Sequence, residues 1–273
     1  MGPRRLFSIS QASGREGLLR MTIPVSQPVR IHLRPGVLFL ATRSGGTLMD
    51  LSGNRYIALS PESALIWSGL AEGRSRADLV EKLAQTKCLD CHAAQIAFER
   101  QLRLWENAKL VSHGDSPQEP LPQPRLPPDA EAIEIDEDAV ARAALSVVLV
   151  AKLMLAEIGY GRSLRNEGLA RTLVRVQREA RREPCENPAT ILLRTLRAYH
   201  ALRRPYKQSH TAHDCLARSL GLTAVLRRKG VCADLCIGVI DLPFQAHAWV
   251  EGNGWVLNEA LSKRRQYAVI GRF

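Results

Sequence analysis

The sequence lacks any long uninterrupted apolar segment. Its most apolar window, residues 143–150 (AALSVVLV), is soon interrupted by Lys152. That window is far shorter than the roughly 20 apolar residues that a membrane-spanning helix needs. Residues 1–20 also lack the continuous apolar core of a secretory signal peptide. We therefore expect no membrane span and a cytoplasmic location.

Cysteine is scarce and scattered, with six residues at positions 88, 91, 185, 215, 232 and 236. A chain of 273 residues, 45% of them hydrophobic, can bury a core without disulfides, so the cysteines are expected to be reduced. Cys88 and Cys91 precede His92, but no second ligand pair follows at the spacing of a zinc site. We expect neither a metal nor a cofactor on this chain.

Acidic residues are in the minority, 27 against 38 lysines and arginines, which gives a net charge of +11. The excess is concentrated between residues 162 and 204, where eleven arginines accompany four glutamates. Two interpretations stay open. The arginines either form solvated helix faces or make a docking surface for an acidic peptide or a protein partner.

Six of the fifteen prolines lie in residues 117–128 (PQEPLPQPRLPP). Such a run cannot fold on itself and acts as a semi-rigid spacer, which predicts a domain boundary. We therefore expect a loose segment over residues 1–20, a front domain over 21–114, a linker over 115–130 and a rear domain over 131–273.

The front domain begins with short β-type runs separated by turns and continues with helical patterns. Strands are predicted at Val29–Leu33, Gly36–Thr42, Thr47–Leu51 and Arg55–Ser60. Helices are predicted at Pro61–Leu70, Ser75–Thr86 and His92–Asn107, the first two with serine caps. Short strands followed by three helices indicate a small winged-helix-like domain.

The rear domain shows helices first and strands last. A helix from about Asp138 to Gly159 has a wide apolar surface and is expected to be a central packing element. Further helices extend to about Leu202, and short β-rich runs follow Gly230 at 231–240, 244–251 and 255–259. The fold class expected for the whole chain is α+β.

Residues 213–259 carry the candidate chemistry. Cys215 falls in the first turn of a predicted helix that ends near Gly230, and a helix start favours the thiolate. His247 lies on one arm of a predicted hairpin, and Asn258 and Glu259 lie on the other. A nucleophile, a base and an orienting polar residue are the parts of a cysteine acyl-transfer site.

The hairpin register decides the third residue. A three-residue loop at 252–254 places Glu259 opposite His247. A two-residue Asn-Gly turn, which the dipeptide favours, flips the parity and places Asn258 on the face of the histidine. Either side chain can accept a hydrogen bond from imidazole, so both remain candidates.

The runs CLARSL from Cys215, PFQAHAWVE from residue 243 and VLNE from residue 256 resemble the B protein of lasso-peptide biosynthesis. That family has a transglutaminase-like fold and a Cys-His-Asp triad, which this resemblance carries onto Cys215, His247 and Glu259. It implies a leader peptidase that acts on a ribosomal precursor peptide. It also implies a partner cyclase that resembles asparagine synthetase and uses ATP.

The pattern LMDLSGNRYIALSP from residue 48, with GRSRADL from residue 73, resembles the precursor-recognition domain of peptide-modifying systems. In that family the leader pairs with an open sheet edge beside the third helix. The resemblance implies leader contacts from the predicted edge strand and from the third helix, at Arg55, Tyr56, Ile57, Leu59, Phe98, Leu102 and Arg103.

Three other functions are weighed against leader cleavage. The third front helix carries Glu99 and Glu106 against Arg100 and Arg103, too even a balance for a helix that faces phosphates, so nucleic acid is not expected as a partner. Acyl transfer to an amine is the reaction of true transglutaminases. A non-catalytic peptide-binding scaffold is the alternative from outside the enzymes.

Overall fold

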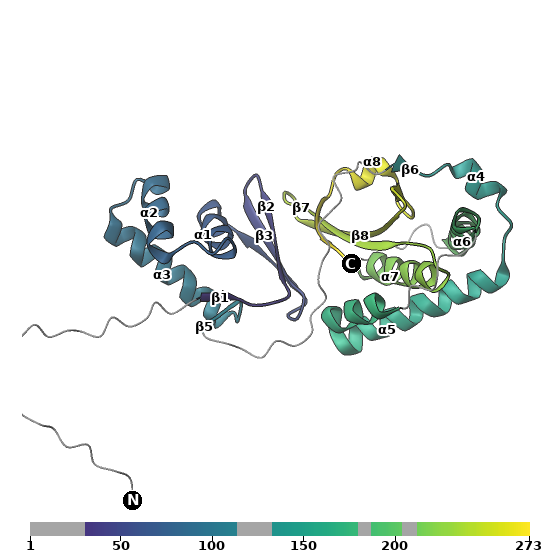
Figure 1. Cartoon of the computed structure of the whole chain (residues 1–273), viewed down its shortest axis with the longest axis horizontal. Coiled ribbons are helices and arrows are strands. Elements are labelled where there is room, and N and C mark those ends of the chain that lie inside the picture. The colour runs from purple at the N-terminus through teal and green to yellow at the C-terminus, as the bar shows by residue number, and fades with distance from the viewer. Residues whose placement is uncertain (1–30, 114–132, 180–186, 204–211) are drawn as a thin grey trace, which may run out of the picture.

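The computed structural model describes residues 31–113, 133–179, 187–203 and 212–273 (Figure 1). The predicted loose segment 1–20 and the predicted linker 115–130 lie outside these residues. The predicted domain boundaries at these two segments therefore stay predictions.

The front part follows the predicted order of strands and helices. Strand β1 (Ile31–Leu33) pairs with β5 (Val111–His113), and β2 (Val37–Thr42), β3 (Gly45–Asp50) and β4 (Arg55–Leu59) form an antiparallel meander. Three helices follow β4: α1 (Pro61–Ala71), α2 (Arg76–Lys87) and α3 (Cys91–Asn107). The predicted strands and helices of this part are confirmed to within a few residues.

Local sequence explains where these helices begin. The Ser60 hydroxyl accepts a hydrogen bond from the Ser63 amide, and proline occupies the first helical position of α1. Ser75 and Asp78 form a reciprocal capping box at the start of α2. These caps satisfy amides that the first helical turn leaves without partners.

The three-stranded sheet is packed on both faces. Because side chains alternate along a strand, Leu48 joins the core under α1–α3, while its neighbour Met49 joins the core of the rear part with Leu235 and Phe273. Leu48 and Met49 are 0% and 1% exposed. The sheet therefore lies between the front helices and the rear strands (Figure 1).

The rear part begins with β6 (Ile133–Glu134), α4 (Glu137–Arg142) and α5 (Val147–Arg178). Helix α5 breaks at Gly168, whose φ of 79° only glycine adopts readily. Hydrogen bonds between the Ser163 and Thr172 hydroxyls and from the Tyr160 hydroxyl to Glu179 join the two halves. The chain therefore folds back on itself at the glycine.

The prediction of one central helix over residues 138–159 is wrong in two respects. The chain leaves the helix between Arg142 and Val147, and the apolar surface is not fully used for packing. Leu153 is buried, whereas Val147, Val148 and Leu155 are 78%, 63% and 65% exposed. A wide apolar surface in sequence does not tell which side of a helix the fold covers.

The remaining elements form the second half of the rear part. Helices α6 (Pro188–Arg203) and α7 (Ala212–Arg228) precede β7 (Asp234–Ile240), β8 (Gln245–Gly252), β9 (Trp255–Val256), the short α8 (Leu261–Arg264) and β10 (Ala268–Arg272). The sheet order is β10-β7-β8-β9-β6, with β6 parallel to β9. Helix α7 packs on β8 through a buried hydrogen bond from the Ser219 hydroxyl to the Ala248 carbonyl, 3.0 Å long.

Mixed helix and strand content confirms the α+β class, although β6 and β10 were not predicted. Within the residues that the structure describes, no helix has the length and apolar character to cross a bilayer.

Candidate active site

Cys215 lies in the first turn of α7, as predicted, and its side chain is half-buried against β8. Burial disfavours the thiolate. Hydrogen bonds with the His247 side chain and the Ala248 backbone, together with the charge of the imidazole, outweigh burial and lower the pKa of the thiol. The thiol is thus held in a site that promotes its ionised form.

His247 lies on β8 opposite Gly238 of β7. Its ring is 6.2 Å from the Trp249 ring in a stacked arrangement and 5.3 Å from the Tyr267 ring. Burial opposes the charge of the imidazole, but hydrogen bonds with Cys215 and Glu259 prevail and raise its pKa to about 9. The lowered pKa of the thiol and the raised pKa of the ring favour a thiolate–imidazolium pair.

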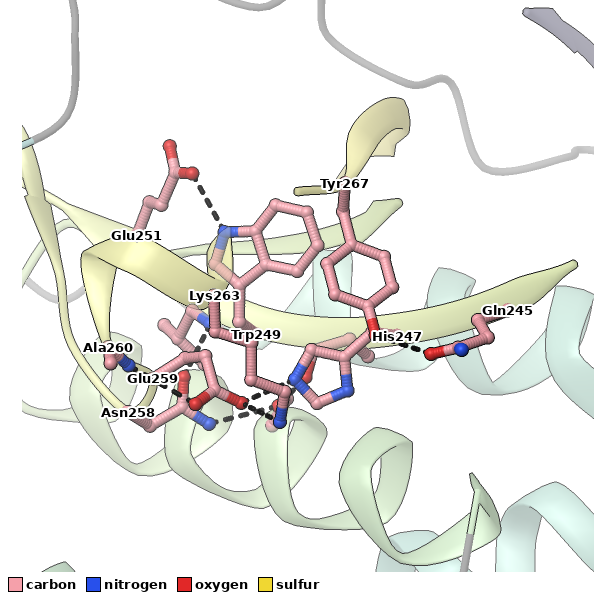
Figure 2. Close-up of polar contacts among 12 residues, drawn as sticks. Gln245, His247, Trp249, Glu251, Asn258, Glu259, Ala260, Lys263 and Tyr267 are labelled. Carbon is pink, nitrogen blue, oxygen red and sulfur yellow. Dashed lines mark hydrogen bonds and ion pairs between the residues drawn. The ribbon is translucent and has the colours of Figure 1, made fainter. Parts of the chain in front are cut away.

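Glu259 completes a row of three side chains. Its Oε2 lies 2.6 Å from His247 Nε2 and 2.8 Å from Lys263 Nζ (Figure 2). Burial raises the pKa of the carboxyl, but these hydrogen bonds dominate and lower it to about 2. Because Nε2 bonds with Glu259, the other ring nitrogen, Nδ1, is the one available for the thiol.

The hairpin register confirms the two-residue turn but not the consequence drawn from it. Gly252 faces Trp255, and Asn253 and Gly254 both have positive φ, as an Asn-Gly turn requires. The ladder, however, ends after Val256, and the chain bends at residues 258 and 259. Parity counted along an extended strand therefore does not reach these positions.

Asn258 consequently points away from the imidazole. Its Oδ1 accepts a hydrogen bond from the Val250 amide at 2.7 Å, and its Nδ2 donates to the hydroxyls of Ser219 and Tyr199. The amide thus joins β8 to α6 and α7. The prediction that Asn258 orients His247 is wrong, and its contacts give it a structural role.

A buried charge cluster behind the histidine was not found from the sequence. Glu251 accepts hydrogen bonds from Trp249 Nε1 at 2.8 Å and from Arg264 at 3.0 Å, and pairs with Arg272 at 2.5 Å. Figure 2 shows the indole between this carboxylate and the imidazole. The cluster fixes the ring on which His247 stacks. His247, Trp249 and Glu251 are spaced two residues apart along β8 and therefore share one face of the strand. This spacing was the signal in the sequence that could have revealed the cluster.

A pocket of about 180 Å³ opens beside the thiol and the imidazole. The rear domain contributes Leu169, Leu216, Ile237 and Ala246. The front sheet contributes a second wall, which includes Tyr56 of β4. Two parts of the chain that are far apart in sequence therefore meet at Cys215.

The predicted leader-contact residues divide into two groups. Strand β4 carries Arg55, Tyr56, Ile57 and Leu59 and pairs only with β3 among the described strands. The side chain of Arg55, at the start of the strand, donates a hydrogen bond to the carbonyl of residue 108. Arg103 on α3 is exposed.

The assignment of Leu59, Phe98 and Leu102 to a leader-facing surface is corrected. Their side chains are 6%, 0% and 3% exposed and belong to the core under the front helices. Hydrophobic periodicity marks the inward face of α3, and that face is already filled.

No group of three metal-binding side chains occurs within the described part of the chain. Cys88 ends α2 in a left-handed conformation and Cys91 begins α3, both at exposed positions. They serve as the junction between the two helices.

Residues 154–272 match the family model described as "Transglutaminase-like superfamily". This part of the chain is therefore similar to transglutaminase-like proteins. The matched segment includes all three residues of the Cys-His-Glu row.

A curated relative is the microcin J25-processing protein McjB of Escherichia coli, 42% identical over 57 residues. The match spans 21% of this chain and 27% of that protein. Together with the superfamily match, it confirms the resemblance to lasso-peptide B proteins.

Two solved structures are also similar, TbiB1 in complex with the TbiA(beta) leader peptide and lasso peptide synthetase B1 complexed with the leader peptide. They are 20% and 23% identical, each with a TM-score of 0.29. The similarity covers 31% and 30% of this chain and 99% and 98% of the two solved chains.

Proposed function

We propose that this protein is a cysteine peptidase of lasso-peptide maturation that binds the leader of a ribosomal precursor peptide and hydrolyses the bond between leader and core. The observation that carries the proposal is the connected row Cys215–His247–Glu259 at one end of a pocket in a transglutaminase-like domain. The pKa shifts of the three groups favour a thiolate, an imidazolium and a carboxylate, the charge states that nucleophilic catalysis needs.

The reaction follows from the row. The Cys215 thiolate attacks the scissile carbonyl and forms a carbon–sulfur bond, while the imidazolium of His247 donates its proton to the departing amine. Water then attacks the thioester while neutral His247 takes its proton. The carbon–sulfur bond breaks, the leader leaves with a new carboxyl group, and the thiolate–imidazolium pair is restored. Glu259 keeps Nε2 hydrogen-bonded, so that Nδ1 faces the sulfur throughout.

The backbone around Cys215 supports the tetrahedral intermediate. The amide of Cys215 lies in the first turn of α7, where the helix dipole contributes partial positive charge. Such an amide is a suitable donor to the oxyanion, and loss of one such donor costs about 10²–10³ in kcat.

Strand β4 is the proposed binding edge for the leader. Its pairing with β3 leaves the opposite edge without a strand partner among the described residues. An extended leader added there gains backbone hydrogen bonds, and alternate side chains supply selectivity. Residues 21–114 are then the recognition domain and residues 131–273 the peptidase domain, acting in the cytoplasm beside an ATP-using lasso cyclase that closes the ring on the freed amine.

The test uses the full chain and a candidate precursor encoded by a short reading frame beside its gene, with an acidic residue early in the core. Wild-type protein is expected to release two fragments whose masses differ from the precursor by one water in total. Cys215→Ala is expected to abolish release while it retains leader binding in a fluorescence-anisotropy titration. Cys232→Ala, at an exposed cysteine outside the site, is the matched control and is expected to cleave normally.

Cleavage by the alanine variant would refute the assignment of the nucleophile. A product that joins two molecules would replace hydrolysis by acyl transfer. Failure of iodoacetamide to label Cys215 in preference to the exposed cysteines would favour a non-catalytic scaffold.

A further inference from the structure

Tyr56 belongs to the front sheet but faces the rear domain. It lies opposite Met49 in the register of β3 and β4, on the face that packs against the rear core. Its ring contacts Phe244, from the turn between β7 and β8, with centroids 5.3 Å apart. Tyr56 is therefore a contact between the strand proposed to bind the leader and the domain that holds the thiol.

The turn that precedes Tyr56 is fixed by a buried carboxylate. Asp50, which is 0% exposed, accepts hydrogen bonds from the Gly53 amide and from Arg55 Nε and pairs with Arg34. Burial raises the pKa of Asp50, but these partners prevail and lower it. A turn held in this way presents Tyr56 to the pocket in one position.

The pocket has the size and lining for one side chain. Its volume of about 180 Å³ is that of roughly six waters, at about 30 Å³ each in the liquid. Seven of its twelve lining residues have apolar or aromatic side chains, among them Tyr56, Leu169, Leu216 and Ile237, and Cys215 and His247 are part of the same wall. An aliphatic side chain can bury its surface against these apolar residues.

The ionisation of Tyr56 agrees with its place next to the thiol. Burial, and then the negative charge of Cys215, raise the pKa of the phenol to about 12. The hydroxyl therefore stays neutral and does not compete with His247 as a base. Its contribution is shape and contact area.

We propose that this pocket is the subsite for one aliphatic side chain within two residues of the scissile bond on the leader side, and that Tyr56 sets its size. The inference rests on the proposed function and deepens it. Tyr56 extends from the strand to which the leader is proposed to pair, so the leader-side residues are the ones that pass it on the way to Cys215. The front domain then selects the cleavage site as well as holding the leader.

The experiment uses the full chain and two sets of probes, N-acetyl-Gly-Xaa and N-acetyl-Xaa-Gly fluoromethyl ketones, with Xaa as Gly, Leu, Trp or Asp. These ketones alkylate a catalytic thiol with loss of fluoride. Labelling of Cys215 is followed by mass spectrometry of its peptide. Each rate is divided by the rate with iodoacetamide on the same variant, which corrects for any change in the thiolate.

In one of the two sets, wild-type protein is expected to react with the Leu probe at least about tenfold faster than with the Gly, Trp or Asp probe, since each methylene in an apolar pocket gives about 10- to 200-fold discrimination. Tyr56→Ala is expected to reduce the Leu/Gly ratio at least fivefold and to admit the Trp probe. Tyr56→Phe, which keeps the ring, is expected to keep the ratio within twofold. Ala246→Leu, which fills the pocket from the rear wall, is expected to reduce the ratio without admitting Trp.

Leu242→Ala is the control for this series, because Leu242 is 78% exposed on the turn that carries Phe244 and does not line the pocket. Thermal melting shows whether each variant folds, and Ala246→Leu provides a second test if Tyr56→Ala does not. A Leu/Gly ratio that neither substitution changes would overturn the inference about the pocket. If iodoacetamide still labels Cys215 preferentially in that case, the proposed peptidase function is not affected. Loss of that preferential labelling in wild-type protein would refute the proposed function itself.

Discussion

Replacing Glu259 by glutamine is expected to weaken the thiolate–imidazolium pair without displacing it. The carboxylate Oε2 lies 2.6 Å from His247 Nε2. With the pKa of Glu259 lowered to about 2 and that of His247 raised to about 9, both groups are charged between these two values. Glutamine keeps the length of the side chain and one acceptor oxygen. It removes the negative charge that favours the protonated ring.

The magnitude follows from the type of bond. A hydrogen bond to a charged group contributes about 1.5–3 kcal/mol, and about 1.36 kcal/mol corresponds to one pKa unit. The ion pair forms at the pH at which the thiol, with its lowered pKa, loses its proton to the solvent. The pH at which Cys215 becomes reactive is therefore expected to rise by about one to two units in Glu259→Gln.

The assay is the rate of iodoacetamide alkylation at Cys215 from pH 4 to pH 10, read by peptide mass. In wild-type protein the rate is expected to rise at a pH below that of an ordinary thiol and to change again near pH 9, where His247 loses its proton. Cys232, an exposed thiol, is the internal reference. At a pH on the rising limb, Glu259→Gln is expected to react about ten- to a hundredfold more slowly than wild type.

Glu259→Asp tests whether the longer glutamate side chain is needed at this position, where the family pattern has aspartate. Aspartate shortens the side chain by one carbon–carbon bond of about 1.5 Å, so from 2.6 Å the carboxylate no longer reaches the ring. The aspartate variant is expected to behave like the glutamine variant. The role assigned to Glu259 would be refuted if the alkylation rate of Glu259→Gln rose at the same pH as that of wild type. It would also be refuted if the aspartate variant showed the pH dependence of wild type.

Three further outcomes concern the support of the site. Asn258→Ala is expected to destabilise the fold by about 1–3 kcal/mol, because the Val250 amide loses its acceptor; urea unfolding checks this. The pH at which the alkylation rate of Cys215 rises is expected to stay the same, which the alkylation assay checks. Glu251→Ala is expected to cost about 3–5 kcal/mol by leaving buried Arg272 with only the more distant carboxylate of Asp234, 3.9 Å away. Because the pKa of Glu251 is lowered on folding, its contribution is present above pH 4.5 and is lost as the pH falls through the folded pKa; thermal melting of variant and wild type across this range checks it. Gly238→Ala puts a methyl 2.6 Å from Trp249, so both stability and Cys215 reactivity are expected to fall, the former by about 1–3 kcal/mol.

Local signals in the sequence were sufficient for the front elements. Ser60 followed by proline, the Ser75–Asp78 pair and the turn residues between short β runs each act within four residues, so the chain's own neighbours decide them. The first turn of α7, which contains Cys215, is of the same kind. The proposed nucleophile and the proposed base were recognisable because each lies on a regular element whose type the sequence indicates.

The third residue depended on where a strand ends. An Asn-Gly turn correctly fixed the first pairs of the β8–β9 hairpin, but β9 stops at Val256 because the chain bends away at residues 258 and 259. The bend is stabilised by the contacts of Asn258 with β8, α6 and α7. These contacts come from distant parts of the chain, so a parity count along one hairpin could not include them.

Burial on helices was ambiguous for a related reason. Phe98 and Leu102 were assigned to a binding surface and are core, whereas Val147 and Leu155 were assigned to a core and are exposed. A periodic apolar stripe shows that a face can be buried. It does not state which neighbour buries it.

The front sheet shows which of its surfaces are covered by other parts of the chain and which surface is left for a ligand. Its strands have apolar residues at successive positions, as in Leu48 and Met49, a pattern typical of a strand covered on both faces. One face is covered by α1–α3 and the other by β10 and the residues around the thiol. A strand covered in this way has only its edge left for a ligand, and the edge of β4 ends at Tyr56 and Arg55, where the pocket begins. Leader binding and peptide cleavage are therefore expected to be properties of one packed unit, because the strand that offers the edge also closes the site.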